Sequence, residues 1–313
     1  MNLLHDNRIR AVALVAAAIV LPLVLPRHYI DVMVFAGLYG IAGLGVGLLL
    51  GQCGIVNLAQ ALFYGIGAYS SAYFCVTMGL APIVGIVAGA AISGLIALLI
   101  GWPVLRLTGF FLALATLGIG IIGNILFYEW DWLTGGTLGI GGIPHLDILG
   151  FTLNTPIRYY YFVWFVLLLL LLLSHNLATG RAGLAMRAMR DSPPAAEALA
   201  VDMHALQTKI FVLCAILGSL AGSLFAHYAT YVSVQSFTVE RSIIFLLIPV
   251  LAGATSVWGI IVGALFVALA PELLSGFGDA HQMLFGLALV LVVTLLPEGI
   301  VGLPKRILKG RGA

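Results

Sequence analysis

The sequence predicts an all-α, polytopic membrane protein, and three observations support this fold class. The 313 residues are 62% hydrophobic and only 8% charged, whereas about a quarter of the residues in soluble domains are charged. Runs such as 163–173 are apolar on every face, which favours helices over barrel strands. This composition excludes a soluble enzyme, a disordered tail and a nucleic-acid binder. The third observation is a set of charge-free intervals, the shortest of which holds 18 residues, enough for a membrane helix: 32–105, 107–128, 159–180, 210–239, 242–271 and 280–297.

We predict ten membrane helices or half-helices in a single domain over residues 1–313. Glycine-rich stretches near 51–54 and 79–82 divide the first long interval into three elements. The interval 242–271 must hold two short or re-entrant elements, broken near 253–259. The predicted elements are 11–26, 30–50, 60–78, 82–101, 108–128, 157–175, 207–227, 241–255, 258–271 and 281–296.

The positions of Lys and Arg predict the orientation, because cytoplasmic loops carry an excess of positive charge. The stretch 129–147 contains acidic residues but no Lys or Arg, so we expect the loop 129–156 outside the cell. Basic clusters at both ends and in the middle of the chain place both termini in the cytoplasm, so an even number of elements must lie between Arg190 and the C-terminal cluster. The basic clusters lie near the start, in the middle and at the end of the chain: Arg8, Arg10, Arg181, Arg187, Arg190, Lys305, Arg306, Lys309 and Arg311.

No catalytic or cofactor motif is present. The chain lacks a GxxxxGK[ST] phosphate-binding loop, HExxH, a CxxC pair and GxSxG. A GxGxxG pattern at 118–123 lies inside an apolar span, not at a strand-to-helix turn, so we expect no dinucleotide site. Cys53, Cys75 and Cys214 lie in apolar stretches and are expected to be buried. We therefore predict no metal, no bound cofactor and no enzymatic activity.

A few polar residues occur within or at the margins of the predicted spans, where they are costly unless they face the bundle interior or a water-filled path. Asn57 and Gln60 follow the glycine-rich break at 51–54, Asn124 lies in a later span, and Glu240 lies at a span margin. They are candidates for lining a translocation path. The alternative is hydrogen bonding between helices without a direct role in transport.

The loop 176–206 is the longest predicted cytoplasmic segment. Arg187 and Arg190 share one face of a basic helix, and Asp191 follows them. Ser192 is a good N-cap for a second helix at about 193–205, with Glu197 near its positively polarised end. We expect this helix to lie along the membrane surface and to be either an amphipathic linker or a docking element for a soluble partner. Its expected exposed residues are Ala195, Ala196, Leu199 and Met203.

Four segments and a closing motif resemble the branched-chain amino acid ABC transporter permeases, specifically the larger of the two permease subunits. The resemblance covers about residues 37–302, and the segments occur in the order typical of the family. They are GIVNLAQALFYGIGAYSSA at 54–72, LRLTGFFLALATLGIG at 105–120, TGRAGLAMRAMRDSPPAAEALAVD at 179–202, SIIFLLIPVLAGATSVWGIIVGALF at 242–266 and LPEGIVGL at 296–303.

The resemblance implies a multi-pass subunit of an importer in a bacterial inner membrane. Its partners would be a second permease, two cytoplasmic ATPase subunits that bind ATP, and a periplasmic substrate-binding protein. The stretch 192–204 is similar to the helix that couples such permeases to their ATPases, and the coupling residues would then be Arg187, Arg190, Asp191, Ala195, Ala196, Glu197, Leu199 and Met203.

Two alternatives remain open from the sequence. Permeases of the same family carry urea, short amides or aromatic acids, and the stretch 57–60 departs from the family's usual pattern. A self-sufficient secondary transporter or channel is the alternative from a different class. It would need ionisable residues within the membrane, and the central parts of the predicted spans contain essentially none.

Overall fold

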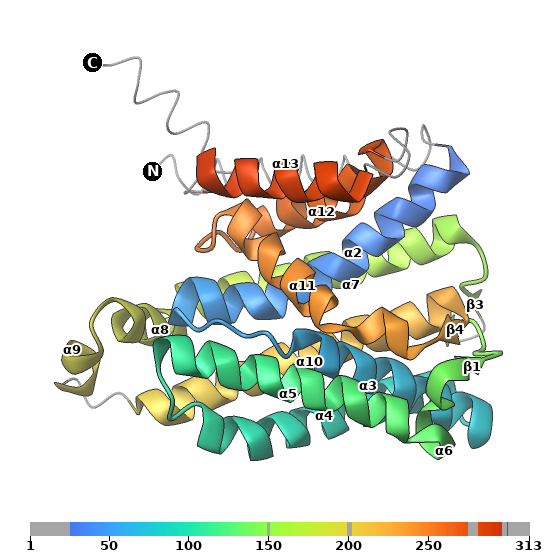
Figure 1. Cartoon of the computed structure of the whole chain (residues 1–313), viewed down its shortest axis with the longest axis horizontal. Coiled ribbons are helices and arrows are strands. Elements are labelled where there is room, and N and C mark those ends of the chain that lie inside the picture. Colours follow the sequence, from blue (N-terminus) through green and yellow to red (C-terminus); the bar gives the residue numbers. More distant parts are fainter. Residues whose placement is uncertain (1–25, 149–150, 199–201, 275–280, 296–298, 300–313) are drawn as a thin grey trace.

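The computed structural model describes residues 26–148, 151–198, 202–274, 281–295 and 299. These residues are mainly helical (Figure 1). The α-helices are α2 (Arg27–Gly47), α3 (Gln60–Ala72), α4 (Pro82–Val104), α5 (Gly109–Glu129), α6 (Asp131–Thr134), α7 (Pro156–Thr179), α8 (Arg181–Asp191), α9 (Pro193–Ala198), α10 (Met203–Ala229), α11 (Val239–Ala252), α12 (Gly259–Leu274) and α13 (His281–Leu295).

Short elements extend or connect these helices. Two π-helical segments, η1 (Leu48–Cys53) and η2 (Tyr73–Thr77), continue α2 and α3, and two 3₁₀ turns are η3 (Gly136–Leu138) and η4 (Val234–Phe237). Strand β1 (Ile140–Gly141) pairs antiparallel with β4 (Tyr231–Val232). Strand β2 (Asp147–Ile148) pairs antiparallel with β3 (Phe151–Thr152).

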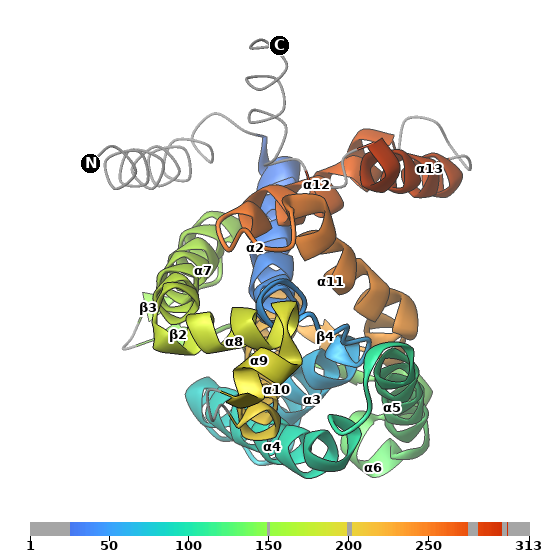
Figure 2. The ribbon, with the colours of Figure 1, turned by 90° about the vertical axis from the view of Figure 1, so that its left-hand side faces the viewer.

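The bundle has two distinct ends (Figure 1). At the end called the α8–α9 end, the short helices α8 and α9 protrude beyond the long ones; Figure 2 looks onto this end. At the opposite end, called the strand end, lie α6 and the four short strands. Helix α2 runs from near the strand end to the α8–α9 end, so its two termini lie in different surroundings.

The core surrounds α2, α3 and α10. Helix α10 packs on α2, α3 and α4, while α2 also packs on α7, α11 and α12. In the most apolar 18-residue stretch of α2 and η1, 83% of the residues are buried. In the corresponding stretches of α4 and α5 the share is 28%. The outer helices expose side chains such as Leu99, Phe110 and Phe165. This outer surface suits lipid or the apolar surface of another membrane subunit.

Five helical segments among the described residues are long and apolar enough to cross a membrane: Arg27–Cys53, Pro82–Val104, Gly109–Glu129, Pro156–Thr179 and Met203–Ala229. α12 is apolar but shorter. These observations confirm a mostly helical fold with several apolar spans. Residues 11–25 of the predicted element 11–26 lie outside the described residues.

Three predicted helix breaks are confirmed, and each involves glycine. Gly54, Gly79 and Gly253 have φ values of 71°, 65° and 92°, a conformation that other residues rarely adopt. They follow η1, η2 and α11. At the first and third breaks, η1 and the turn between α11 and α12 lie in contact with each other.

The predicted second helix at about 193–205 is wrong in its extent. α9 begins after Ser192, as predicted, but it ends at Ala198, and Met203 is the first residue of α10. The Asp202 side chain caps α10 by accepting a hydrogen bond from the Ala205 backbone N–H at 2.9 Å. This cap makes Met203 part of a long bundle helix instead of the surface helix.

Candidate functional site

The C-terminal end of α2 lies at a closely packed junction. The helix loosens into the π-helical segment η1 and stops at Gly54. A Cβ on Gly51 would lie only 1.8 Å from the carbonyl oxygen of Ala254, in the turn between α11 and α12. Gly51 therefore allows the backbones of two distant segments to touch.

Two arginines of α8 bind this helix end. Arg190 donates a hydrogen bond from Nη1 to the Gly51 carbonyl oxygen at 2.5 Å. Arg187 donates from Nη1 to the Gln52 side-chain oxygen at 3.2 Å and to the Ala178 carbonyl oxygen, at the end of α7, at 2.6 Å. Carbonyl groups at a helix C-terminus carry partial negative charge, so two guanidinium groups stabilise this end electrostatically.

The turn between α11 and α12 completes the junction. Gln52 donates from Nε2 to the Thr255 carbonyl oxygen at 3.4 Å while its own oxygen accepts the bond from Arg187. α8, η1 and the α11–α12 turn are thus joined by backbone and side-chain bonds. We call Gly51, Gln52, Arg187, Arg190 and the segment 254–255 the arginine junction.

A second polar cluster follows directly along the chain. Residues 55–59, between η1 and α3, are not helical, and their backbone groups need partners inside the bundle. Leu58 N–H donates to the Thr116 hydroxyl of α5 at 3.2 Å. In the first turn of α3, Ala61 N–H donates to the Ser242 hydroxyl of α11 at 2.8 Å. The irregular segment is therefore bonded to α5, and the start of α3 is bonded to α11.

Gln60 is the centre of this cluster. Its side-chain nitrogen donates to the carbonyl oxygens of Ala42 in α2 at 3.1 Å and of Cys214 in α10 at 3.2 Å. Its oxygen accepts from the Cys214 thiol at 3.1 Å and from the Asn57 amide nitrogen at 3.4 Å. Gln60 thus links α2, α3 and α10, and we call this network the Gln60 cluster.

Asn57 and Gln60 are both fully buried, and their amides are bonded to protein groups. The Asn57 oxygen accepts from the Ala59 N–H at 3.0 Å, which shapes the chain just before α3. In this conformation both residues serve the contacts between helices. Their role in lining a path stays a prediction.

The other two candidates for lining a path lie apart from this cluster. Asn124 is half-buried and donates to the Phe237 carbonyl oxygen at 3.2 Å. Glu240 is exposed in the first turn of α11. The structure therefore brings together two of the four candidate residues.

The candidate coupling residues lie on α8, α9 and α10. Glu197 and Asp191 are exposed, and Asp191 pairs with Arg190 at 2.9 Å. The predicted exposure of Ala196 is wrong, because its side chain is fully buried where α9 folds back on α8. Met203 is half-buried in α10, so it is not an exposed residue of the surface helix. Leu199 lies outside the described residues, as does the side chain of Ala195.

Sequence reasoning missed several members of the arginine junction. Gln52 and Thr255 are separated by about 200 residues and carry no recognisable motif. The glycine-rich breaks in the sequence were the feature that could have indicated this contact. Gly51 lies in η1 and Gly253 precedes the α11–α12 turn, and these two segments touch in the structure. Within the described residues, no group of three His, Cys, Asp or Glu side chains could hold a metal ion.

The class of this protein follows from the comparison with known families. Residues 28–293 match the family described as the permease component of a branched-chain amino acid transport system. The chain belongs to this family, which is a family of membrane transport components and not of enzymes. Both the arginine junction and the Gln60 cluster lie within the matched region.

Two relatives are similar along nearly the whole chain. The high-affinity branched-chain amino acid transport system permease protein LivM of Escherichia coli (strain K12) is 31% identical, covering 95% of this chain and 76% of the relative. LivM of Salmonella typhimurium (strain LT2) is also 31% identical, covering 95% and 75%. No solved structure matches the chain significantly.

Proposed function

We propose that the chain is a permease subunit of an ATP-driven importer for branched-chain amino acids in a bacterial inner membrane. The observation that carries this proposal is the family match over residues 28–293. A second permease, two ATPase subunits and a periplasmic binding protein would complete the importer. ATP would be bound and hydrolysed by the ATPase subunits, because the chain has no phosphate-binding loop of its own.

The proposed orientation places the α8–α9 end in the cytoplasm and the strand end outside. Arg181, Arg187 and Arg190 lie at the first end, in agreement with the preference of basic residues for cytoplasmic loops. Both termini would then be cytoplasmic and the ten predicted elements would cross or enter the membrane. Accessibility of a cysteine at position 184 to a membrane-impermeant thiol reagent in oriented vesicles tests this sidedness.

The surface that would meet an ATPase is the tip formed by α8 and α9. Leu184 is 61% exposed on α8, and Pro193, Pro194 and Glu197 are exposed on α9. An exposed leucine on α8 and two exposed, rigid prolines on α9 are suited to a groove on a soluble protein. Buried Met186 and Met189 hold the opposite face of α8 against the bundle.

Movement of this tip would reach the membrane helices through the arginine junction. Arg187 and Arg190 connect α8 directly to η1, and the segment after η1 enters the Gln60 cluster. A displacement of α8 by the ATPases would therefore move α2, α10 and the α11–α12 turn together. This is a rigid-body form of alternating access.

Reconstitution of the four kinds of subunit in proteoliposomes tests the proposed function. We expect import of L-leucine that requires ATP and the binding protein. Glu197→Arg should abolish import while leaving membrane insertion unchanged, because it reverses a charge on the docking tip. The matched control is Glu129→Arg, an exposed reversal at the end of α5 that should leave import unchanged. Import by the chain alone, without ATPases, would support a secondary transporter and contradict the proposal.

A further inference from the structure

The 3₁₀ turn η4 (Val234–Phe237) inserts apolar side chains into the bundle near the strand end. It connects β4, which lies at that end, to the start of α11. Val234 and Phe237 are 2% and 1% exposed, although Gln235 between them is exposed. A connection between a short strand and a helix usually runs over the surface of a protein. This one instead fills space inside the bundle, and we call η4 the plug.

Phe237 lies at the centre of an aromatic cluster. Its ring centre lies 5.9 Å from that of Tyr64 and 5.2 Å from that of Tyr69, both in α3. It lies 6.0 Å from the ring of Phe127 in α5 and 6.3 Å from that of Phe225 in α10. These separations are typical of packed aromatic pairs. The ring of Phe237 therefore occupies the space between three helices.

Two residues of the neighbouring helices fit the plug closely. A Cβ on Gly65 would lie 2.4 Å from Cε2 of Phe127 and 3.1 Å from Cγ of Phe237, so the absence of a side chain there makes room for both rings. Asn124 of α5 donates from Nδ2 to the Phe237 carbonyl oxygen at 3.2 Å. Asn124 was a candidate for lining a path, and here it holds the backbone of the plug.

The aromatic cluster contains two buried hydroxyl groups. Among the described residues, neither the Tyr64 nor the Tyr69 hydroxyl has a hydrogen-bond partner, and both rings pack on Phe237. A buried hydroxyl without a partner raises the free energy of the conformation that contains it. If Phe237 left the cluster, both hydroxyls could bond water or a polar solute. Their placement therefore favours a plug that opens over a permanently packed core.

The plug lies between the strand end and the Gln60 cluster. Helix α3 begins at Gln60 and continues toward the strand end (Figure 1), and Tyr64 lies about one turn after Gln60. Ser242, which accepts the hydrogen bond from Ala61 in that turn, follows the plug closely along the chain. A solute that moves along α3 from the strand end to the buried amide of Gln60 would meet Phe237 first.

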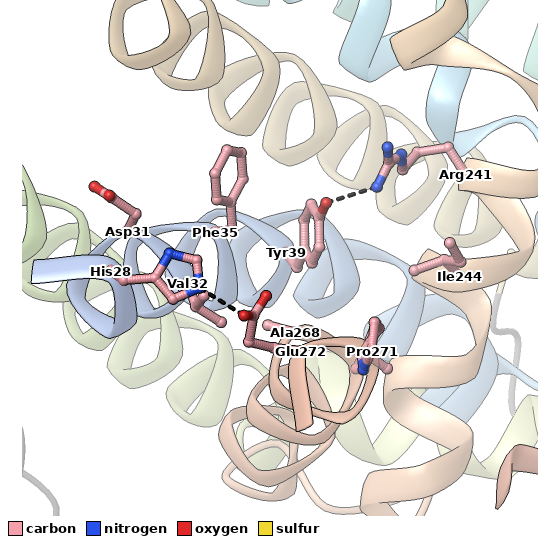
Figure 3. Close-up of a pocket in the computed structure, with 11 residues that line it drawn as sticks. His28, Asp31, Val32, Phe35, Tyr39, Arg241, Ile244, Ala268, Pro271 and Glu272 are labelled. Atoms are coloured by element: carbon pink, nitrogen blue, oxygen red, sulfur yellow. Dashed lines mark hydrogen bonds and ion pairs between the residues drawn. The ribbon is translucent and has the colours of Figure 1, made fainter. Parts of the chain in front are cut away.

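Helix α11 can carry the plug, because one of its ends is packed and the other borders open space. It begins directly after the plug and ends at the turn that belongs to the arginine junction. Beside its first turns lies a cavity of about 420 Å³, bordered also by α2 and α12 (Figure 3). Ile244 and Arg241 line this cavity, and Arg241 Nη1 donates to the Tyr39 hydroxyl of α2 at 2.6 Å. Close-packed interiors resist displacement, so an open volume is where a helix can shift.

We propose that the plug is the outer gate of the translocation path and that Phe237 is the side chain that closes it. The proposal deepens the proposed function and rests on it for the direction of transport. The structure shows the closed gate. Opening moves Phe237 out from between α3, α5 and α10 and turns the Tyr64 and Tyr69 hydroxyls toward the path. Gly65 and Asn124 are positioning residues, because they fit the ring and the backbone of the plug in the closed state.

A disulfide across the gate tests the proposal. In the double variant Gly65→Cys, Phe237→Cys, the Cβ at position 65 would lie 3.1 Å from the place of the Phe237 Cγ, which the new sulfur takes. A disulfide requires about 3 Å between the Cβ of one cysteine and the sulfur of the other. In proteoliposomes that hold all partner subunits, oxidation should abolish L-leucine import and dithiothreitol should restore it. Each single-cysteine variant is a matched control and should import equally with and without the oxidant.

The disulfide experiment has two outcomes that overturn the proposal. Unchanged import by an importer whose cross-link is complete, as measured by mass spectrometry, would show that the plug does not close the path. Thiols that stay reduced in the presence of the oxidant would show that the plug does not lie against α3.

A second measurement uses a native thiol and needs no disulfide. Cys214 is 1% exposed and bonds Gln60, so it lies beyond the plug when approached from the strand end. Phe237→Ala removes the closing ring, and a small, membrane-impermeant methanethiosulfonate applied from that side should modify Cys214 at least about tenfold faster. The matched control is Phe211→Ala, which removes another buried ring of similar size that packs on Phe63, and it should leave the rate unchanged. Equal rates in the two variants would contradict the gate.

The gate and the proposed function can fail separately. If the importer transports L-leucine with the disulfide complete, the gate is wrong and the function stands. If Phe237→Ala exposes Cys214 to the reagent from the strand end but ATP drives no import in the unaltered assembly, the gate stands and the proposed function is wrong.

Discussion

The two ends of α2 differ in almost every physical respect. At Gly51 the helix end is filled by backbone from the α11–α12 turn and is bonded to two arginines. Between Asp31 and Tyr39 the same helix borders a cavity of about 420 Å³ with charges on both sides. A closely packed helix end has low compressibility, so a displacement of its neighbours moves the helix as well. An open end has space for a small molecule. The packed end therefore suits the proposed coupling to the ATPases, whereas the other end leaves space beside the helix.

The largest expected effect is that of Gly51→Ala. Its Cβ would collide with a backbone oxygen at 1.8 Å, so a whole turn has to move. We expect the free energy of unfolding to fall by about 3 kcal/mol, measured by SDS-induced unfolding in mixed micelles. The control is Gly118→Ala, a helical glycine with no atom within 4 Å of the added Cβ, which should be neutral or stabilising. If both variants are equally stable, the packed description of this helix end is wrong.

The next effect in size is that of Arg190→Gln. The substitution removes the charged partner of the Gly51 carbonyl, and we expect a loss of about 2 kcal/mol in unfolding free energy. In the reconstituted importer, ATP hydrolysis should continue while leucine import falls. Arg181→Gln, which changes an exposed arginine of the same helix, should leave both rates unchanged. If leucine import per ATP hydrolysed is unchanged in Arg190→Gln, the arginine junction does not couple the ATPases to the membrane helices.

The smallest effect on stability is expected at the open end, for Tyr39→Phe. The ring remains beside the Arg241 guanidinium, and only the hydroxyl that accepts its hydrogen bond is lost. We expect a change of about 1 kcal/mol or less in unfolding free energy, since the guanidinium keeps access to water through the cavity. A loss as large as that of Gly51→Ala would show that the two ends are equally packed.

The helix breaks were predictable because glycine and proline act locally. Gly54, Gly79 and Gly253 adopt positive φ, and Pro82 and Pro156 each begin a helix, so the chain's own chemistry places these boundaries. The burial of Ala196 was not predictable in the same way. Alanine occurs on both buried and exposed faces of helices, so the residue type alone does not predict its burial. Ala196 is buried because α9 packs against α8.

The charged residues that line the cavity beside α2 were visible in the sequence, but only as the ends of charge-free intervals. Asp31, Arg241 and Glu272 each end a charge-free interval, so they marked where the spans stop. Their meeting in one cavity depends on how α2, α11 and α12 pack, and no local pattern records this packing. The same reason explains why Gln60 could be identified as a polar residue in a span but not as the link between three helices.

The burial of the cysteines has a practical consequence for measuring the proposed motions. The chain has three cysteines, Cys53, Cys75 and Cys214, and their exposures are 5%, 7% and 1%. Thiol reagents should therefore react slowly with the native protein. The unaltered protein can then be the control that measures background labelling. A single cysteine introduced at an exposed position such as 184 or 193 would carry a spin label or a fluorophore without removal of the native thiols.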